Sequence, residues 1–301
     1  MVNNFIKICS NFKGEKSKIL VLDSGIPTNN SLLKNIVFEK SVNFFDSPYF
    51  EKYDENIQYF YDNKRFSYEK EDEFDHYDHQ TNIVSVITSN FLGISPKSKI
   101  ICGKILNKHG KGPIITILEG LIYANKINPD IVNISTGYSL SEISRSQDYH
   151  IHDRINEEIV KLYEKNILVI CSKKKSEVGF YPADFKETIS VSENNNDNYN
   201  TSDYIYEKTN FLLQTNKNGL KIDKGSSFMT AFIAGVLSNY ITFLKINKRN
   251  VNIEKIKRLI KKNKNYFSEL YSPTITLAEM SVDDINNILK DLSKGKKKLN
   301  Y

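Results

Sequence analysis

The sequence predicts an α/β fold in three layers: a mostly parallel, doubly wound sheet with helices on both faces. The first observation is that short apolar runs, often β-branched, alternate with helical patterns along most of the chain. The second is that these runs end at small or polar residues. In parallel sheets covered by helices, active sites lie at the carboxyl ends of the strands, so we expect the functional residues there.

The elements follow one another along the chain. The strand-like runs are KILVLDSG (18–25), KIICGKIL (99–106), DIVNISTG (130–137), NILVICS (166–172) and ETISVSE (187–193). The helical patterns cover 80–92, 112–128, 143–166 and 226–247, and a basic amphipathic helix lies within 245–264. In this last helix Ile253, Ile256, Leu259 and Ile260 recur at helical spacing.

The chain of 301 residues is predicted to form a single main domain over residues 17–265. Residues 1–16 are an N-terminal extension, and 266–301 form a short appendage with a basic tail. Two stretches interrupt the pattern and are interpreted as loop insertions. One, near 45–76, is rich in Tyr, Phe, Asp and Glu, and the other, near 193–218, begins with an asparagine-rich segment.

Composition excludes several classes of protein. Hydrophobic residues make up 40% and charged residues 26%, as in an ordinary globular protein, and no run approaches the 18 apolar residues of a membrane span. The N-terminus lacks the features of a signal peptide, which predicts a cytoplasmic protein with no membrane partner. Three widely spaced cysteines fit a reducing compartment and do not indicate a disulfide framework or a zinc site.

The net charge of +6 is concentrated in residues 245–264 and in the tail KGKKKLNY. A basic helix can bind nucleic acid, but no aromatic interleaving or nucleic-acid motif accompanies this one. We therefore interpret it as a helix with a solvated lysine face and predict no nucleic-acid partner.

Three residues are candidates for nucleophilic catalysis. Asp23 ends an apolar strand, His79 opens a helical pattern, and Ser227 follows a glycine at the start of another helix. A serine hydroxyl needs a base to become nucleophilic, and a carboxylate orients that base. The alternatives are an Asx turn at Asp23 and a site of close helix packing at Ser227.

The segment DHYDHQ also contains His76, Asp75 and Asp78. His76 lies in the polar lead-in and is expected to be exposed. The cluster raises the possibility of a metal site, but no second group with ligand spacing follows, so we predict none. Loops rich in Asp and Glu leave calcium as an alternative, but no ligand spacing supports a calcium site.

Six segments, in this order, resemble motifs of the subtilisin-like serine peptidases. They are VLDSGI (21–26), HQTNIVSVI (79–87), GISPKSKIICGKIL (93–106), DIVNISTG (130–137), YPADF (181–185) and GSSFMTAFIAG (225–235). The resemblance spans about residues 17–262, and the order Asp, His, Ser is that of subtilisin. It implies a subtilisin-like fold, with Asp23, His79 and Ser227 as the triad. It also implies that Ser135, Thr136 and Gly137 form the edge that binds an extended peptide, with Gly112 on the opposite edge.

One departure from the family pattern affects catalysis. Where the family has AAGN, whose asparagine amide donates to the oxyanion, this chain has a run of lysines that aligns Lys175 with the asparagine. Loss of one such donor costs about 10² to 10³ in rate, a magnitude measured in subtilisin itself. Lys175 either replaces the missing donor or leaves the oxyanion hole half empty.

The resemblance implies a serine endopeptidase that forms an acyl-enzyme. Its compact, leaderless form resembles intracellular peptidases that remove the leader from a lantibiotic or bacteriocin precursor, so a leader peptide is the expected partner. The alternative is a catalytically impaired pseudopeptidase that binds a peptide or a protein. The sequence sets no oligomeric state.

Overall fold

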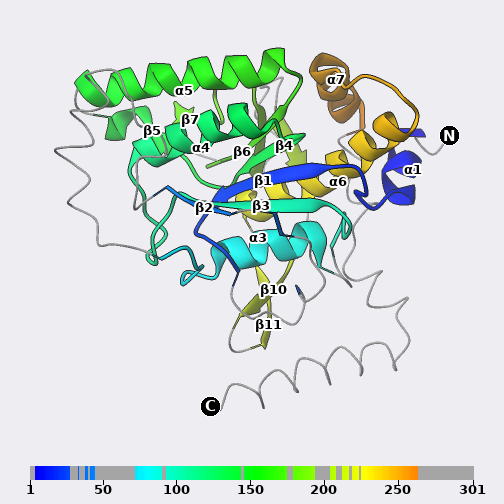
Figure 1. Ribbon diagram of the computed structural model, residues 1–301, viewed down its shortest axis with the longest axis horizontal. Coiled ribbons are helices and arrows are strands. Elements are labelled where there is room, and N and C mark those ends of the chain that lie inside the picture. The colour runs from blue at the N-terminus through cyan, green and yellow to red at the C-terminus, as the bar shows by residue number, and fades with distance from the viewer. Residues whose placement is uncertain are drawn as a thin grey trace.

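A seven-stranded, fully parallel sheet forms the centre of the molecule in the computed structural model (Figure 1). The structure describes residues 4–27, 33, 38, 39, 41–44, 72–89, 93–143, 146–174, 179–193, 204–207, 212–216, 219–223 and 225–263. In spatial order the strands are β2 (Val42–Asn43), β3 (Lys99–Lys104), β1 (Lys18–Asp23), β4 (Ile131–Ile134), β6 (Leu168–Lys173), β8 (Ile189–Glu193) and β9 (Tyr204–Glu207). The order reverses beside β1, so the sheet is doubly wound, as predicted.

Helices cover both faces of this sheet (Figure 1). One face carries α4 (Ile114–Ile127) and α5 (Ser146–Glu164), and the other carries α3 (His79–Thr88) and α6 (Ser226–Ile246). The short helix α1 (Asn4–Asn11) and the basic helix α7 (Ile253–Asn263) pack on the side of α6. The predicted three-layer α/β fold is therefore confirmed.

The strands divide their side chains between two cores because successive residues of a strand point to opposite faces. In β1, Ile19 and Val21 face the core of α3 and α6, whereas Leu20 and Leu22 face the core of α4 and α5. This two-sided burial explains why the strands are apolar throughout, as parallel strands covered on both faces are. It also carries the end of β1, and with it Asp23, into the interior.

Helix α6 runs through the protein as a core helix. By length and composition it could cross a membrane, but 89% of its most apolar window is buried inside the protein. Its packing against the segment that follows α3 is close at Gly235, where an added Cβ would lie 2.8 Å from Ile94 Cβ. The helix begins at Ser226, directly after Gly225, which has a φ of 152° that disfavours any other residue.

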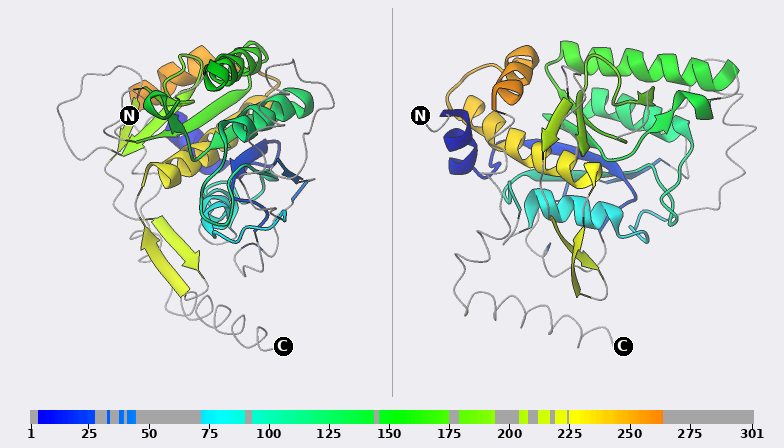
Figure 2. Two further views of the ribbon diagram at one scale, coloured as in Figure 1. Left: turned by 90° about the vertical axis from the view of Figure 1, so that its left-hand side faces the viewer. Right: turned by 180° about the vertical axis from the view of Figure 1, so that it is seen from behind.

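Two smaller ribbons complete the described structure. One pairs β5 (Tyr138–Ser139) with β7 (Phe180–Tyr181), and the other pairs β10 (Leu212–Asn216) with β11 (Gly219–Asp223). Figure 2 shows the second ribbon standing away from the sheet. A 3-10 turn, Leu140–Glu142, precedes α5.

The range 193–218, predicted as a loop insertion, contains the strands β9 and β10. Its asparagine-rich opening favours a loop, but Tyr204–Glu207 and Leu212–Asn216 contain aromatic and apolar residues that fit a pleated sheet. Most of the other predicted insertion, near 45–76, and the appendage 266–301 lie outside the described residues. The predicted domain boundaries stay predictions.

Candidate active site

Asp23 is the last residue of β1, and its side chain is completely buried. The N–H of Ser24 donates to Asp23 Oδ1 at 2.8 Å. A buried carboxylate is costly unless it is hydrogen-bonded, so the position requires donors. The second donor comes from His79.

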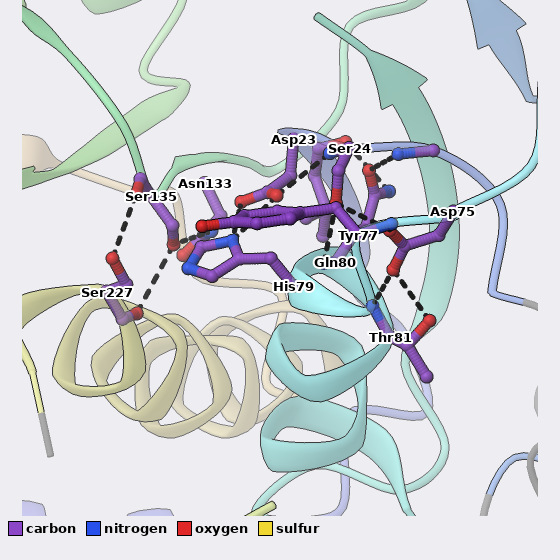
Figure 3. Close-up of polar contacts among 12 residues, drawn as sticks. Asp23, Ser24, Asp75, Tyr77, His79, Gln80, Thr81, Asn133, Ser135 and Ser227 are labelled. Atoms are coloured by element: carbon purple, nitrogen blue, oxygen red, sulfur yellow. Dashed lines mark hydrogen bonds and ion pairs between the residues drawn. The ribbon is translucent and has the colours of Figure 1, made fainter. Parts of the chain in front are cut away.

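His79 is the first residue of α3, and its imidazole meets the Asp23 carboxylate. Nδ1 lies 2.7 Å from Oδ1 and 2.9 Å from Oδ2 (Figure 3). A carboxylate on Nδ1 holds the proton there and leaves Nε2 as the acceptor. The outer edge of the ring points toward Ser227. The structure therefore pairs His79 with Asp23 and places the first turn of α6 beside the imidazole, whose centroid lies 6.1 Å from that of the Phe228 ring.

Ser227 lies in the first turn of α6, where backbone N–H groups have no partner within the helix. Its hydroxyl donates to the carbonyl of Ser135 at 2.9 Å, and Ser135 Oγ donates to the carbonyl of Ser227 at 3.2 Å. Within the described residues, the hydrogen bond of the Ser227 hydroxyl thus goes to Ser135. The hydrogen bond expected between Ser227 and His79 stays a prediction.

Asp75, which the sequence offered only as part of a histidine and carboxylate cluster, organises the loop before α3. Its buried carboxylate accepts the hydroxyl of Ser24 at 2.8 Å and both the N–H and the hydroxyl of Thr81 at 2.7 Å. Asp75 therefore fixes the start of α3 against the end of β1, which sets the distance between His79 and Asp23. His76 points away to Asp72 and is exposed, as predicted.

Two further buried side chains hold the turn after Asp23. Gln80, the second residue of α3, accepts the N–H of Gly25 at 2.8 Å. Lys104, at the end of β3, donates to the carbonyls of Ser24 at 2.7 Å and Phe74 at 2.9 Å. The sequence signal for Lys104 is a lysine at the buried end of an apolar strand, which indicates paired polar groups.

The predicted peptide-binding edge, Ser135–Gly137, directly follows β4. Buried Asn133 donates from Nδ2 to Ser135 Oγ at 2.9 Å and so connects the sheet to Ser227 through Ser135. Thr136 and Gly137 are partly exposed. Gly112 lies in the connection from β3 to α4, packed on the Ile105 carbonyl. The roles of these residues in binding stay predictions.

Tyr77 is a site residue that the sequence did not suggest. Its ring lies over the imidazole of His79, with centroids 5.9 Å apart and an angle of 31° between the rings (Figure 3). The ring also packs on Gly110, where an added Cβ would lie 2.6 Å from Tyr77 Cε1 and Cζ. Tyr77 is 46% exposed, so it forms a surface beside the general-base candidate.

The structure describes the first two residues of the lysine run, Lys173 and Lys174. Lys173 Nζ lies 2.5 Å from Asp184 Oδ1, and Lys174 Nζ lies 5.4 Å from the ring centroid of Phe180. Lys175 lies outside the described residues, so its position at the oxyanion hole stays a prediction. In the part of the chain that is described, no three His, Cys, Asp or Glu side chains are placed to hold a metal ion.

Comparison with known families agrees with this geometry. The sequence profile of the Subtilase family matches residues 14–273. The chain belongs to the subtilase family. The match covers every described element of the sheet and all three candidate catalytic residues.

Curated relatives of this subtilase are bacterial proteases at low identity. It is 26% identical over 190 residues to the minor extracellular protease Epr of Bacillus subtilis (strain 168), across 62% of this chain and 24% of Epr. It is 25% identical over 185 residues to the intracellular serine protease of Paenibacillus polymyxa, across 54% of this chain and 53% of that protein. It is 25% identical over 193 residues to the major intracellular serine protease of B. subtilis (strain 168), across 60% and 51%. This subtilase therefore matches between a quarter and about half of the length of these relatives.

Solved structures share the fold. The prenylagaramide maturation protease PagA matches with a TM-score of 0.60 and 16% identity over 85% of this chain and 86% of PagA. A cold-adapted subtilisin-like serine proteinase matches with a TM-score of 0.60 and 15% identity over 84% of each chain. The PatG macrocyclase in complex with peptide matches with a TM-score of 0.62 and 14% identity over 85% of this chain and 86% of that one.

Proposed function

We propose that this subtilase is a serine endopeptidase in which Ser227 is the nucleophile, His79 the general base and Asp23 the residue that orients His79. The observation that carries the proposal is the Asp23–His79 pair at 2.7 Å, with the outer edge of the imidazole directed at Ser227 (Figure 3). Such an arrangement suits acyl transfer, because the base is already oriented by its carboxylate.

Substrate binding releases the nucleophile in this mechanism. The carbonyl of Ser135, which accepts the Ser227 hydroxyl, is also an edge acceptor for the backbone N–H of an extended peptide. When the peptide N–H takes this carbonyl, the Ser227 hydroxyl turns to His79. Nε2 accepts the proton as Oγ bonds to the scissile carbonyl carbon, and the protonated His79 then gives this proton to the leaving amine. Water hydrolyses the acyl-enzyme by the same route.

The oxyanion is stabilised by the backbone N–H at the start of α6, where the helix dipole favours negative charge. We assign the second donor to Lys175, the residue that aligns with the family asparagine. Its ammonium group is a donor with a full positive charge.

The substrate is a precursor peptide from which this subtilase removes a leader, as in lantibiotic or bacteriocin maturation. Two fold relatives support this class of substrate, since one is named as a maturation protease and another as a macrocyclase in complex with peptide. We place the protein in the cytoplasm. Two relatives are named intracellular, and Cys9, Cys102 and Cys171 are buried free thiols, which fits a reducing compartment.

A fluorophosphonate probe tests the activity directly, because it reacts only with an activated serine. We expect labelling at Ser227, found by peptide mass spectrometry, and loss of labelling in Ser227→Ala. Ser226→Ala, the neighbouring serine in the same helical turn, should label as the parent does. A protein that stays unlabelled at high probe concentration is the pseudopeptidase, and labelling that survives Ser227→Ala means that the nucleophile lies elsewhere.

A further inference from the structure

We infer that this subtilase accepts only a small side chain on the residue whose carbonyl Ser227 attacks, because Phe180 fills the space where a larger side chain would lie. The inference rests on the proposed function and specifies its substrate. It assigns a specificity role to Phe180, a residue outside the catalytic triad.

The place of that side chain follows from the strand arrangement. A peptide that pairs with Ser135–Gly137 and presents its carbonyl to Ser227 runs along the end of β4. The neighbour of β4 in the sheet is β6, which ends at Lys173. The side chain of the attacked residue therefore enters between the edge at Gly137 and the end of β6.

Phe180 packs against one wall of this space and lies near the other. A Cβ placed on Gly137 would lie 2.6 Å from Phe180 Cε1 and 2.8 Å from Cζ, so the ring is packed against the Gly137 backbone. On the β6 side, Lys174 Nζ stands 5.4 Å from the centroid of the same ring. Phe180 is only 2% exposed, which leaves little room for a second large group beside it.

The position of the Phe180 ring is fixed because the Phe180 backbone is hydrogen-bonded to Asp184. The N–H of Phe180 donates to Asp184 Oδ2 at 3.0 Å, and the carbonyl of Phe180 accepts the N–H of Asp184 at 3.0 Å. Lys173 at the end of β6 binds the other oxygen of that carboxylate at 2.5 Å. Phe180 is also a member of β7, which pairs with β5 directly after Gly137. Four connections thus fix the backbone of Phe180 between the end of β6 and the β5–β7 ribbon, so a bound peptide must adapt to its ring.

Gly137 fits the same conclusion. Any side chain at position 137 would collide with Phe180 and with the Tyr181 carbonyl, at 2.5 Å. The glycine allows the Phe180 ring to approach the strand edge closely. Gly137 and Phe180 together close the space for the substrate side chain. The attacked residue of the substrate is therefore a glycine, alanine or serine.

Peptidyl diphenyl phosphonates test this inference, since they carry the side chain of the attacked residue and react with the serine itself. The set carries Gly, Ala, Leu or Phe at that residue on one peptide backbone. We expect the parent protein to react at least about 10-fold faster with the Gly and Ala probes than with the Leu and Phe probes, the discrimination typical of a pocket that lacks space. Phe180→Ala should raise the rates for Leu and Phe about 10-fold or more and leave Ala within a few-fold.

Phe185→Ala is the matched control, an aromatic residue on the same segment whose ring contacts Tyr181 and His152 instead. Its preference should equal that of the parent. If Phe180→Ala does not fold, the test uses Phe180→Leu together with the parent protein's ratio of rates for the small and large probes. Equal rates for Ala and Phe probes in the parent, or an unchanged preference in a folded Phe180 variant, would overturn the inference.

A protein without peptidase activity is distinguishable from an active protein that lacks the predicted side-chain preference. In that case the fluorophosphonate probe, which has no side chain at this position, also fails to label. The inference is then tested by binding of free peptides that end in Ala or Phe to Ser227→Ala, measured by calorimetry. Tighter binding of the Ala peptide supports it, and equal or weaker binding contradicts it.

Discussion

At the scale of single residues, the site depends on buried polar groups that each have specified partners. The Asp23 carboxylate receives His79 and the Ser24 N–H, and the neighbouring turn is held by Lys104, Gln80 and Asp75. Removing one partner of a buried polar group costs more than the group contributes, because the other partner is left unpaired. Substitution of Lys104, Gln80 or Asp75 should therefore lower both the stability and the activity of the protein.

Lys104→Met illustrates this, since it keeps the length of the side chain but leaves the carbonyls of Ser24 and Phe74 without their donor. We expect a loss of about 2–4 kcal/mol in the free energy of unfolding, measured by urea denaturation. Lys99→Met on the same strand is the control. Its ion pair with Glu39 is exposed and should contribute less than about 1 kcal/mol. Equal losses in the two variants would show that Lys104 does not hold the turn.

Lys175→Ala separates the possible roles of the lysine run. If Lys175 donates to the oxyanion, kcat should fall by about 10² or more with little change in KM, because the interaction forms only in the transition state. Steady-state kinetics on a cleaved peptide measures both constants. A rise in KM with kcat unchanged would assign Lys175 to substrate binding, and a few-fold change in either constant would leave it without a role.

At the scale of elements, the site lies where strand ends meet helix starts. β1 ends at Asp23, α3 begins at His79 and α6 begins at Ser226. The sequence predicts these positions because each is local: an apolar run ends, or a helical pattern begins. It does not predict that Phe180 lies on Gly137 or that Lys173 pairs with Asp184, because these contacts depend on how β7 folds back beside β5.

His152 on α5 provides a pH-dependent link between that helix and the β5–β7 ribbon. Its ring lies among Tyr138, Tyr181 and Phe185, and its Nδ1 is 3.0 Å from the Tyr138 hydroxyl. Burial lowers the pKa of His152, and the nearby charge of Asp153 opposes this only in part. The unfolded chain therefore binds this proton at a higher pH than the folded protein does.

The free energy of unfolding should consequently fall as the pH drops below about 6.5, the ordinary histidine value, and be fully restored above it. His152→Phe removes this contribution and should give a shallower dependence between pH 7 and 5. Urea titrations of both proteins at several pH values measure it. Parallel curves would mean that His152 does not contribute.

At the scale of the whole molecule, two cores on either side of one sheet protect the interior. Cys9 and Cys102 lie in the core of α3 and α6, and Cys171 lies in the core of α4 and α5. Burial raises the pKa of all three thiols. Thiolates are the reactive form, so these cysteines should be inert in the folded protein.

We expect no reaction with Ellman's reagent at pH 8 under native conditions and three reactive thiols in denaturant. A single thiol that reacts early would show that one core opens independently of the other. The order of reaction, found by mass spectrometry after partial labelling, identifies which core that is.

If Asp23, His79 and Ser227 act as one catalytic unit, a variant that lacks two of them should be no less active than a variant that lacks one. The measurement is kcat/KM on a cleaved peptide for His79→Ala, Ser227→Ala and the variant that carries both changes. Residues that act as a unit are strongly non-additive, so each single change should cost about as much as the pair, roughly 10⁴ to 10⁶. Losses that multiply in the double variant, or a Ser227→Ala protein that keeps its activity, would show that these residues do not act as one catalytic unit.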